Sequence, residues 1–344
     1  MSDAKSLKAQ AWTLFDRIVE LAAASEGRTT GTPWFRYADG RLTYWPDYAV
    51  LQQLLGVPLL LNAPSQSGVP ALGLDVWTSY ELRRAGFEPD LVWPRATPPR
   101  ILPSTLVALR REATREQLRV LDSMLQSGKT YNNETGASAN ILGKNYVKQV
   151  DVVMSAWNTG PEILISTKRM DSSFGKNAAN RVEESYGDAK NLRSRHPQAA
   201  LGFLFSLRST ALKPQFEDVA AWIVDLLGKL GREDDAYDAV CLIIPEWSDE
   251  VAEPSGDDGD GEDPLVSAGL TSARLPEDEP LPLELPESEV DRQLRQLPAV
   301  ELNRKAVPST LSPEVFFATI VNRVLDNSPV NFHREARRRR ANPA

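Results

Sequence analysis

The chain has 344 residues, of which 42% are hydrophobic and 25% are charged, and this composition is typical of a soluble globular protein. No apolar run approaches the length of about 18 residues that a membrane-spanning helix needs, and the first residues lack the apolar stretch of a secretory signal. The single cysteine, Cys241, lies in a strand-like apolar run and has no second cysteine with which to form an internal disulfide. We therefore expect a cytoplasmic protein in which Cys241 is buried.

The net charge of −8 conceals an uneven distribution of charge along the chain. Residues 249–291 contain 15 acidic side chains and one basic side chain, a local net charge of −14, so the rest of the chain carries +6. The acidity therefore belongs to one segment, and an anionic partner such as a nucleic acid remains compatible with the other residues.

The first 103 residues are predicted to form an N-terminal module of mixed or helical structure. Apolar residues recur at helical spacing over residues 12–22 and 48–55, and residues 40–45 resemble a short strand. The module ends in an extended, proline-rich stretch over residues 92–103.

A more regular alternation of helices and strands follows over residues 104–247. We predict a helix over 104–125, strands over 149–154 and 162–167, a helix over 177–195, a strand over 200–207, a helix over 216–227 and a strand over 239–244. The turn at residues 158–161 is short enough to join the first two strands as a hairpin, whereas helices separate the later strands. This order predicts an α/β core, with a mixed β-sheet flanked by helices.

The remaining residues are predicted to form an insert and a tail. Residues 248–295 are acidic and rich in proline, so they cannot offset the entropy of ordering and are expected to be disordered. Residues 296–344 should hold a helix that docks on the body, with Ser312 as its N-cap and Pro313 in its first turn, followed by a basic tail.

One strand carries residues that are unusual for a buried core. Side chains alternate across a strand, so Ser166 and Lys168 should share a face, and a hairpin would bring Asp151 of the preceding strand close to both. A carboxylate suits Mg²⁺, which prefers oxygen ligands. Together a metal ion and a lysine can orient a water and stabilise the negative charge that develops on an attacked phosphate.

The order of elements and these residues resemble the PD-(D/E)xK nuclease superfamily, which has the restriction-endonuclease-like fold, over residues 104–247. The motif would be Asp151 followed by Ser166-Thr167-Lys168, with Val150 in place of the usual proline and Ser166 in place of the middle carboxylate. The resemblance implies a Mg²⁺-dependent endonuclease of the restriction or phage-defence kind that hydrolyses double-stranded DNA, commonly as a homodimer. It also implies target recognition by the N-terminal module.

In a subset of restriction endonucleases, the second carboxylate has moved to the helix that follows the lysine. Here that helix contains Glu183 and Glu184. With about 100° per residue, Glu183 should lie at the edge of the apolar stripe formed by residues 179, 182, 186 and 189, and Glu184 should lie on the opposite side. We therefore expect Glu183 to be the better second metal ligand, with Glu184 in reserve.

Polar and basic residues gather in the same segment and are candidates for contacts with nucleic-acid phosphates. They are Lys144, Lys148, Arg169, Lys176, Asn177 and Arg181. Two other functions remain open. Ser166 would also suit an inactive nuclease fold that only binds DNA or assembles with a partner, and the acidic segment would suit an interaction protein.

Overall fold

The computed structural model describes residues 2–24, 31–126, 139–172, 174–248 and 285–344 of the chain. Most of the predicted insert, residues 249–284, lies outside the described residues. Within them, no helix is long and apolar enough to cross a membrane.

The centre of the fold is a mixed, five-stranded β-sheet with the order β3–β6–β7–β8–β9. The strands are β3 (Val92–Trp93), β6 (Val152–Ala156), β7 (Gly160–Met170), β8 (Ala200–Leu207) and β9 (Ala239–Ile243). The pairs β3–β6 and β6–β7 are antiparallel, whereas β7–β8 and β8–β9 are parallel. The predicted α/β class with a mixed sheet is confirmed.

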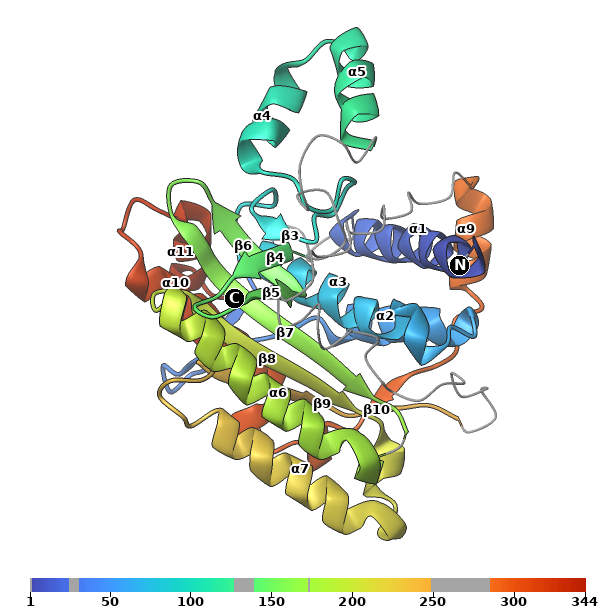
Figure 1. Cartoon of the computed structure of the whole chain (residues 1–344), viewed down its shortest axis with the longest axis vertical. Helices are drawn as coiled ribbons and strands as arrows, with labels where there is room; N and C mark the ends of the chain where they lie inside the picture. Colours follow the sequence, from blue (N-terminus) through green and yellow to red (C-terminus); the bar gives the residue numbers. More distant parts are fainter. Residues whose placement is uncertain (1, 25–30, 127–138, 173, 249–284) are drawn as a thin grey trace.

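Two crossover helices cover one face of this sheet, as the parallel pairs require. Helix α6 (Phe174–Arg195) connects β7 to β8, and α7 (Glu217–Leu230) connects β8 to β9. The two helices lie side by side over the sheet (Figure 1). Apolar side chains of β7 and β8, among them Leu164 and Phe203, are buried beneath them.

Helices α3 (Val69–Arg84) and α10 (Pro313–Asn327) lie against the other face of the sheet, and α1 (Ser2–Ala24) and α2 (Tyr48–Leu60) pack on α3. Ile165 and Leu204 of the sheet belong to the same hydrophobic cluster as residues of these helices. Phe317 of α10 packs on both Tyr44 and Trp77. The described residues among the first 103 therefore add a layer to the main sheet, since α3 packs on β6 and β7 while α1 and α2 pack on α3.

The other strands of the described residues form three short two-stranded sheets. They are β1 (Trp34–Arg36) with β2 (Leu42–Tyr44), β4 (Ala139–Leu142) with β5 (Val147–Val150), and β10 (Pro245–Glu246) with β11 (Glu301–Leu302). All three pairs are antiparallel.

The helix predicted over residues 104–125 is two helices, α4 (Ser104–Glu112) and α5 (Arg115–Gln126). Ala113 is extended, and Thr114 then caps α5: its backbone N–H donates to the Gln117 side chain, and its hydroxyl accepts from the Gln117 N–H. The pair projects from the body of the molecule (Figure 1) and leaves Leu109 half exposed.

The C-terminal segment is folded onto the body. The α9 helix (Glu287–Leu294) lies within the insert that was predicted to be disordered, and it is held by an ion pair of 2.8 Å between Arg17 and Asp291. Ser312 caps α10 by accepting the Val315 N–H, as predicted. The basic tail forms α11 (Arg334–Ala341).

Candidate active site

Asp151 lies where the chain passes from β5 to β6, so the strand predicted over residues 149–154 is interrupted there. Val150 and Val152 are fully buried, Val150 in the hydrophobic cluster beneath α6 and α7 and Val152 in the cluster beneath α3 and α10. Asp151 is therefore held where the chain passes from one face of the sheet to the other. One Asp151 carboxylate oxygen accepts the backbone N–H of Thr167, at 2.8 Å. The structure thus brings Asp151 to the Ser166-Thr167-Lys168 segment, as the sequence predicts.

The side chains of β7 alternate as expected. Leu164 belongs to the core beneath α6 and α7, whereas Ile165 belongs to the core beneath α3 and α10. Ser166 and Lys168 therefore share the face of Leu164, and Thr167 points to α3. Ser166 is buried, and Lys168 is partly exposed.

A second carboxylate reaches this point from α3. The Thr167 hydroxyl donates to Asp75 at 2.5 Å. Burial and the negative charge of Asp151 raise the pKa of Asp75 well above its ordinary value, while the Thr167 hydrogen bond and the positive charges of Lys8 and Lys168 oppose that rise. Asp75, Asp151 and Lys168 therefore lie in one electrostatic neighbourhood.

The sequence analysis missed Asp75, although the sequence contains a signal for it. Asp75 is a partly buried acid in α3, and its neighbours Leu74 and Val76 are buried. Acidic side chains are rarely placed in an apolar helix face unless they have a partner. That partner, Thr167, comes from a strand far along the chain, so the residue pattern alone could not identify it.

The structure does not gather Glu183 and Glu184 with these carboxylates. Both side chains are exposed on α6, and the described residues contain no group of three His, Cys, Asp or Glu side chains that could hold a metal. The buried face of α6 runs through residues 181, 185, 188, 189 and 192. At about 100° per residue, Glu183 lies opposite that face and Glu184 on its flank. The predicted stripe was out of phase because the buried face includes Arg181, Ser185 and Asp188, which a search for apolar residues passes over.

The predicted nucleic-acid contacts are divided by burial. Lys144 is exposed, whereas Lys148 is only 6% exposed and its ammonium lies 3.0 Å from Asp188. Lys148 therefore takes part in an internal ion pair and is not available for a contact at the surface. The alternation of β5 buries its side chain on the same side as that of Val150.

Arg181 is buried on α6, and Arg169 is buried with its Nε donating to Asp171 at 2.7 Å. The side chains of Lys176 and Asn177 lie outside the described part of the chain. Among the predicted contact residues whose side chains the structure describes, Lys144 is thus the exposed one.

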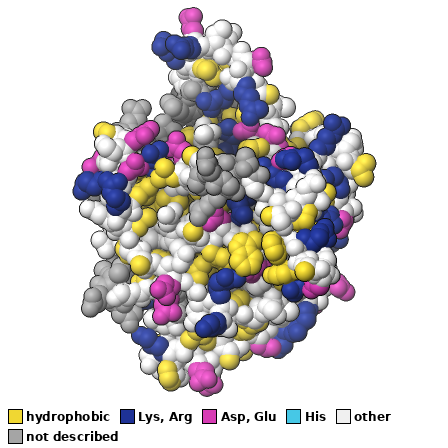
Figure 2. Space-filling model, turned by 180° about the vertical axis from the view of Figure 1, so that it is seen from behind, with side chains coloured by type: hydrophobic (Ala, Val, Ile, Leu, Met, Phe, Trp, Pro, Cys, Tyr) yellow, Lys and Arg dark blue, Asp and Glu magenta, His cyan; other side chains and the backbone are white. Residues whose placement is uncertain are grey.

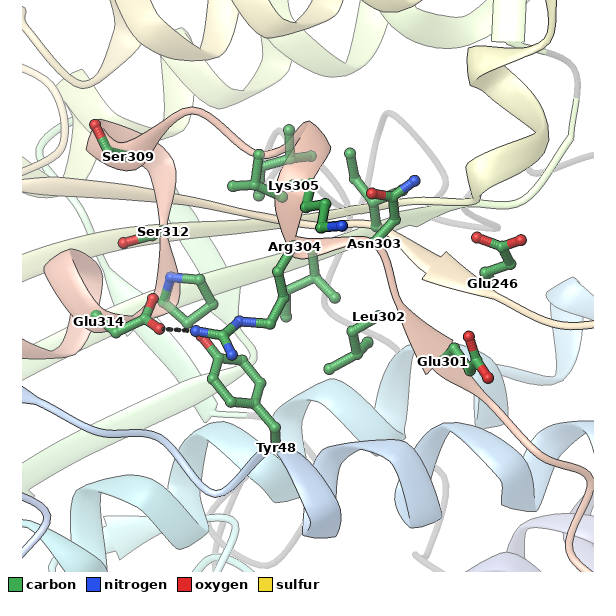
Figure 3. Close-up of a pocket in the computed structure, with 15 residues that line it drawn as sticks. Tyr48, Glu246, Glu301, Leu302, Asn303, Arg304, Lys305, Ser309, Ser312 and Glu314 are labelled. Carbon is green, nitrogen blue, oxygen red and sulfur yellow. Dashed lines mark hydrogen bonds and ion pairs between the residues drawn. The ribbon is translucent and has the colours of Figure 1, made fainter.

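A cavity of about 800 Å³ lies elsewhere, beside β9 and β11. Figure 3 shows Arg304 crossing it, with its guanidinium 2.6 Å from Glu314 and over the ring of Tyr48. The guanidinium of Arg304 and the carboxylate of Glu314 are thus paired with each other. Metal-dependent hydrolysis of a phosphodiester uses carboxylates to hold the ion and a cation to stabilise the developing negative charge, and Asp75, Asp151 and Lys168 could supply these groups.

No protein-family model, no curated protein and no solved structure matches this chain. Any function must therefore be argued from the fold and from the residues themselves.

The cluster suits a divalent cation. The negative charge of Asp151 raises the pKa of Asp75, so the two carboxylates repel, and an ion bound between them would relieve that repulsion. Their oxygen atoms are the ligands that Mg²⁺ prefers, and Mg²⁺ commonly takes only one or two carboxylates and keeps several waters. Asp75 and Asp151 are thus the residues that would hold it.

Proposed function

We propose that the protein is a Mg²⁺-dependent endonuclease with a restriction-endonuclease-like core, and that it hydrolyses phosphodiester bonds of double-stranded DNA in restriction or phage defence. The hydrogen bond between Asp151 and the Thr167 backbone carries this proposal. It holds a carboxylate beside the strand that bears Lys168, at the end of a hairpin that is followed by a crossover helix and a parallel strand.

Each residue has a separate task in this proposal. Asp75 and Asp151 would hold the metal, which would supply Lewis acidity for activating a water. Lys168 orients the attacking water and stabilises the negative charge of the pentavalent phosphate. Thr167 positions both carboxylates, since its backbone N–H binds Asp151 and its hydroxyl binds Asp75.

The surface offers basic groups for the DNA backbone. The projecting α4–α5 pair bears the exposed Arg111, Arg115 and Arg119, and Lys144 is exposed beside β4 and β5. Figure 2 shows Lys and Arg side chains on the projecting part and, over the body, interspersed with acidic ones. We assign phosphate contacts to Arg115 and Arg119 of the projecting pair, because Arg111 is already paired with Asp90.

The second candidate is a nuclease fold that binds DNA without cleaving it. Ser166 in the place of the middle carboxylate favours this function, as does the lack of a three-carboxylate group among the described residues. The two functions differ in whether Lys168 is needed for a chemical step.

DNA cleavage separates the two candidates. Supercoiled plasmid and phage DNA are incubated with the wild type and with Lys168→Ala, with Mg²⁺ or with EDTA. We expect cleavage that requires Mg²⁺ and that falls by about 100-fold or more in the variant. If the wild type binds DNA but cleaves none of it, the endonuclease proposal is wrong and the binding function replaces it.

A further inference from the structure

The two most exposed large hydrophobic side chains of the described residues lie at one corner of the molecule. Trp157, in the turn between β6 and β7, is 95% exposed, and Val330, in the loop between α10 and α11, is 84% exposed. A contact of 2.9 Å between His333 Nε2 and a Glu162 carboxylate oxygen joins the two segments, because Glu162 lies near the turn and His333 directly precedes α11. Figure 1 shows the β6–β7 turn beside α11.

The turn holds Trp157 away from the body. Ala156 pairs with Gly160 across the hairpin, so residues 157–159 form a three-residue loop. Just before the loop, the Ser155 N–H donates to the carbonyl of Leu91, which anchors the hairpin to its neighbour in the sheet. Tryptophan is on average a highly buried residue, and an indole in solvent contributes little to the stability of the fold. Its position on a short, anchored turn therefore indicates contact with a partner.

The same corner is basic. Residues 334–341 of α11 include five arginines and one acid, Glu335, a net charge of +4. The ion pairs of these arginines are made with Glu335 and Asp326, so five guanidinium groups share two carboxylates. Arg334 is exposed, and its guanidinium has no ion pair or hydrogen bond with the residues that the structure describes. Figure 2, in which this corner lies at the right, shows Lys and Arg side chains beside hydrophobic ones.

An exposed indole beside an excess of positive charge fits a nucleic-acid strand better than a membrane surface. On a bilayer, Trp157 and Val330 would bury less apolar area than one acyl chain, which alone gives only marginal binding. On a nucleic acid, an aromatic ring stacks on a base while arginines neutralise phosphates. Neighbouring bases cover both faces of a base inside a duplex, so the strand that Trp157 contacts must be single.

From these observations we propose that Trp157 and α11 bind single-stranded DNA. One base stacks on the indole, and the phosphates beside it are paired with Arg334 and attracted by the net charge of α11. The stacking and the charge suit any single strand, and only the choice of DNA rests on the proposed function. Gly160, at the turn, and Lys168 are separated along β7 by about 27 Å, so this corner is distinct from the candidate active site.

Fluorescence anisotropy of a labelled thymidine strand of about 12 nucleotides tests the proposal. The full-length protein is used in EDTA, so that no metal-dependent cleavage takes place. Trp157→Ala should weaken binding by about tenfold, and Trp157→Phe, which keeps an aromatic ring, should retain most of the affinity. The matched control is Trp222→Ala, which removes a half-exposed tryptophan of α7 and should bind like the wild type.

The contribution of charge is measured by the salt dependence of binding. Arg334→Gln should reduce the slope of log affinity against log salt concentration by about 0.7, which is the contribution of one phosphate contact on a single strand. Arg232→Gln, at an exposed arginine beyond α7, should leave the slope unchanged. A strand of equal length whose sugars lack bases separates the two terms: on it the effect of Trp157→Ala should vanish, while that of Arg334→Gln should remain.

Three results would overturn the proposal. They are a wild type that does not bind the strand, a Trp157→Ala protein that binds it like the wild type, and a loss in Trp157→Ala that persists on the strand without bases. If anionic vesicles sediment the wild type but not Trp157→Ala, and the strand is not bound, the corner binds a membrane instead. Tighter binding of the corresponding uridine RNA strand would overturn the choice of DNA.

The outcome is separable from that of the proposed function. Wild-type protein that binds the strand through Trp157 but cleaves no DNA in Mg²⁺ would reject the endonuclease and keep this surface. Cleavage by a protein whose strand binding does not depend on Trp157 would keep the endonuclease and reject this surface.

Discussion

At the scale of single residues, the site depends on the two hydrogen bonds of Thr167, from its backbone to Asp151 and from its hydroxyl to Asp75. Asp151 and Lys168 were predictable, because strand alternation and a short turn place them together. Asp75 was not, since the contact joins a helix of one layer to a strand of the next. The role predicted for Glu183 depended on which face of α6 is buried. Polar residues on that buried face hid its position from a search for apolar residues.

The buried ion pair of Lys148 and Asp188 provides a stability prediction at this scale. Asp188→Ala should lower the free energy of unfolding by about 3 kcal/mol, because it removes a carboxylate that pairs with the buried Lys148 ammonium and accepts from Tyr146. Urea denaturation followed by circular dichroism measures the loss.

The matched control is Asp235→Ala, which removes an ion pair of similar length, 3.1 Å, with Lys190. Both side chains of that pair are exposed, so the loss should be less than about 1 kcal/mol. Equal losses in the two variants would show that the Lys148 pair is not an internal one.

At the scale of elements, the strands and helices of residues 139–247 were largely predictable. The bounds of β8 match the predicted ones, because a largely apolar stretch ends at Arg208 and both faces of the strand are buried. The break between α4 and α5 was missed because the apolar stripe continues past Ala113, while the capping pair of Thr114 and Gln117 decides the local geometry.

The docking of α11 makes a prediction for Gly86. This residue has φ +101°, and an added Cβ would lie 2.8 Å from the backbone nitrogen of Ala336 in α11. Gly86→Ala should therefore cost about 2–4 kcal/mol, from backbone strain together with displacement of α11.

Gly40→Ala is its control. Gly40 also has a positive φ, +86°, but an added Cβ there would meet nothing within 4 Å. Only the backbone cost of about 1 kcal/mol is expected. If unfolding measurements give the same loss for both glycines, α11 is not held closely against Gly86.

At the scale of the whole molecule, the layers explain why residues 1–103 cannot be treated as an appendage. Helix α3 covers the sheet and also supplies Asp75, so the N-terminal part contributes both to the core and to the site. The sequence predicted the classes of its elements but not this packing, because apolar periodicity shows that a face is buried without showing what it is buried against.

Charge gives a further prediction at this scale. Residues 249–284 contain 12 acidic side chains and one basic side chain. We expect these acids to compete with DNA phosphates for the basic groups of the body. Replacing this segment by a Gly-Ser linker of equal length should tighten nonspecific DNA binding at low salt by several-fold and steepen its salt dependence. An unchanged salt slope in a DNA-binding titration would exclude this competition.

The most direct measurement is the single-turnover rate of Mg²⁺-dependent DNA cleavage by the wild type, Asp75→Asn and Glu183→Gln. If Asp75 and Asp151 hold the metal beside Lys168, Asp75→Asn should lose about 100-fold or more of the rate, whereas the exposed Glu183 should be replaceable with less than about a threefold change. Cleavage that survives in Asp75→Asn and is lost in Glu183→Gln would contradict this account of the site.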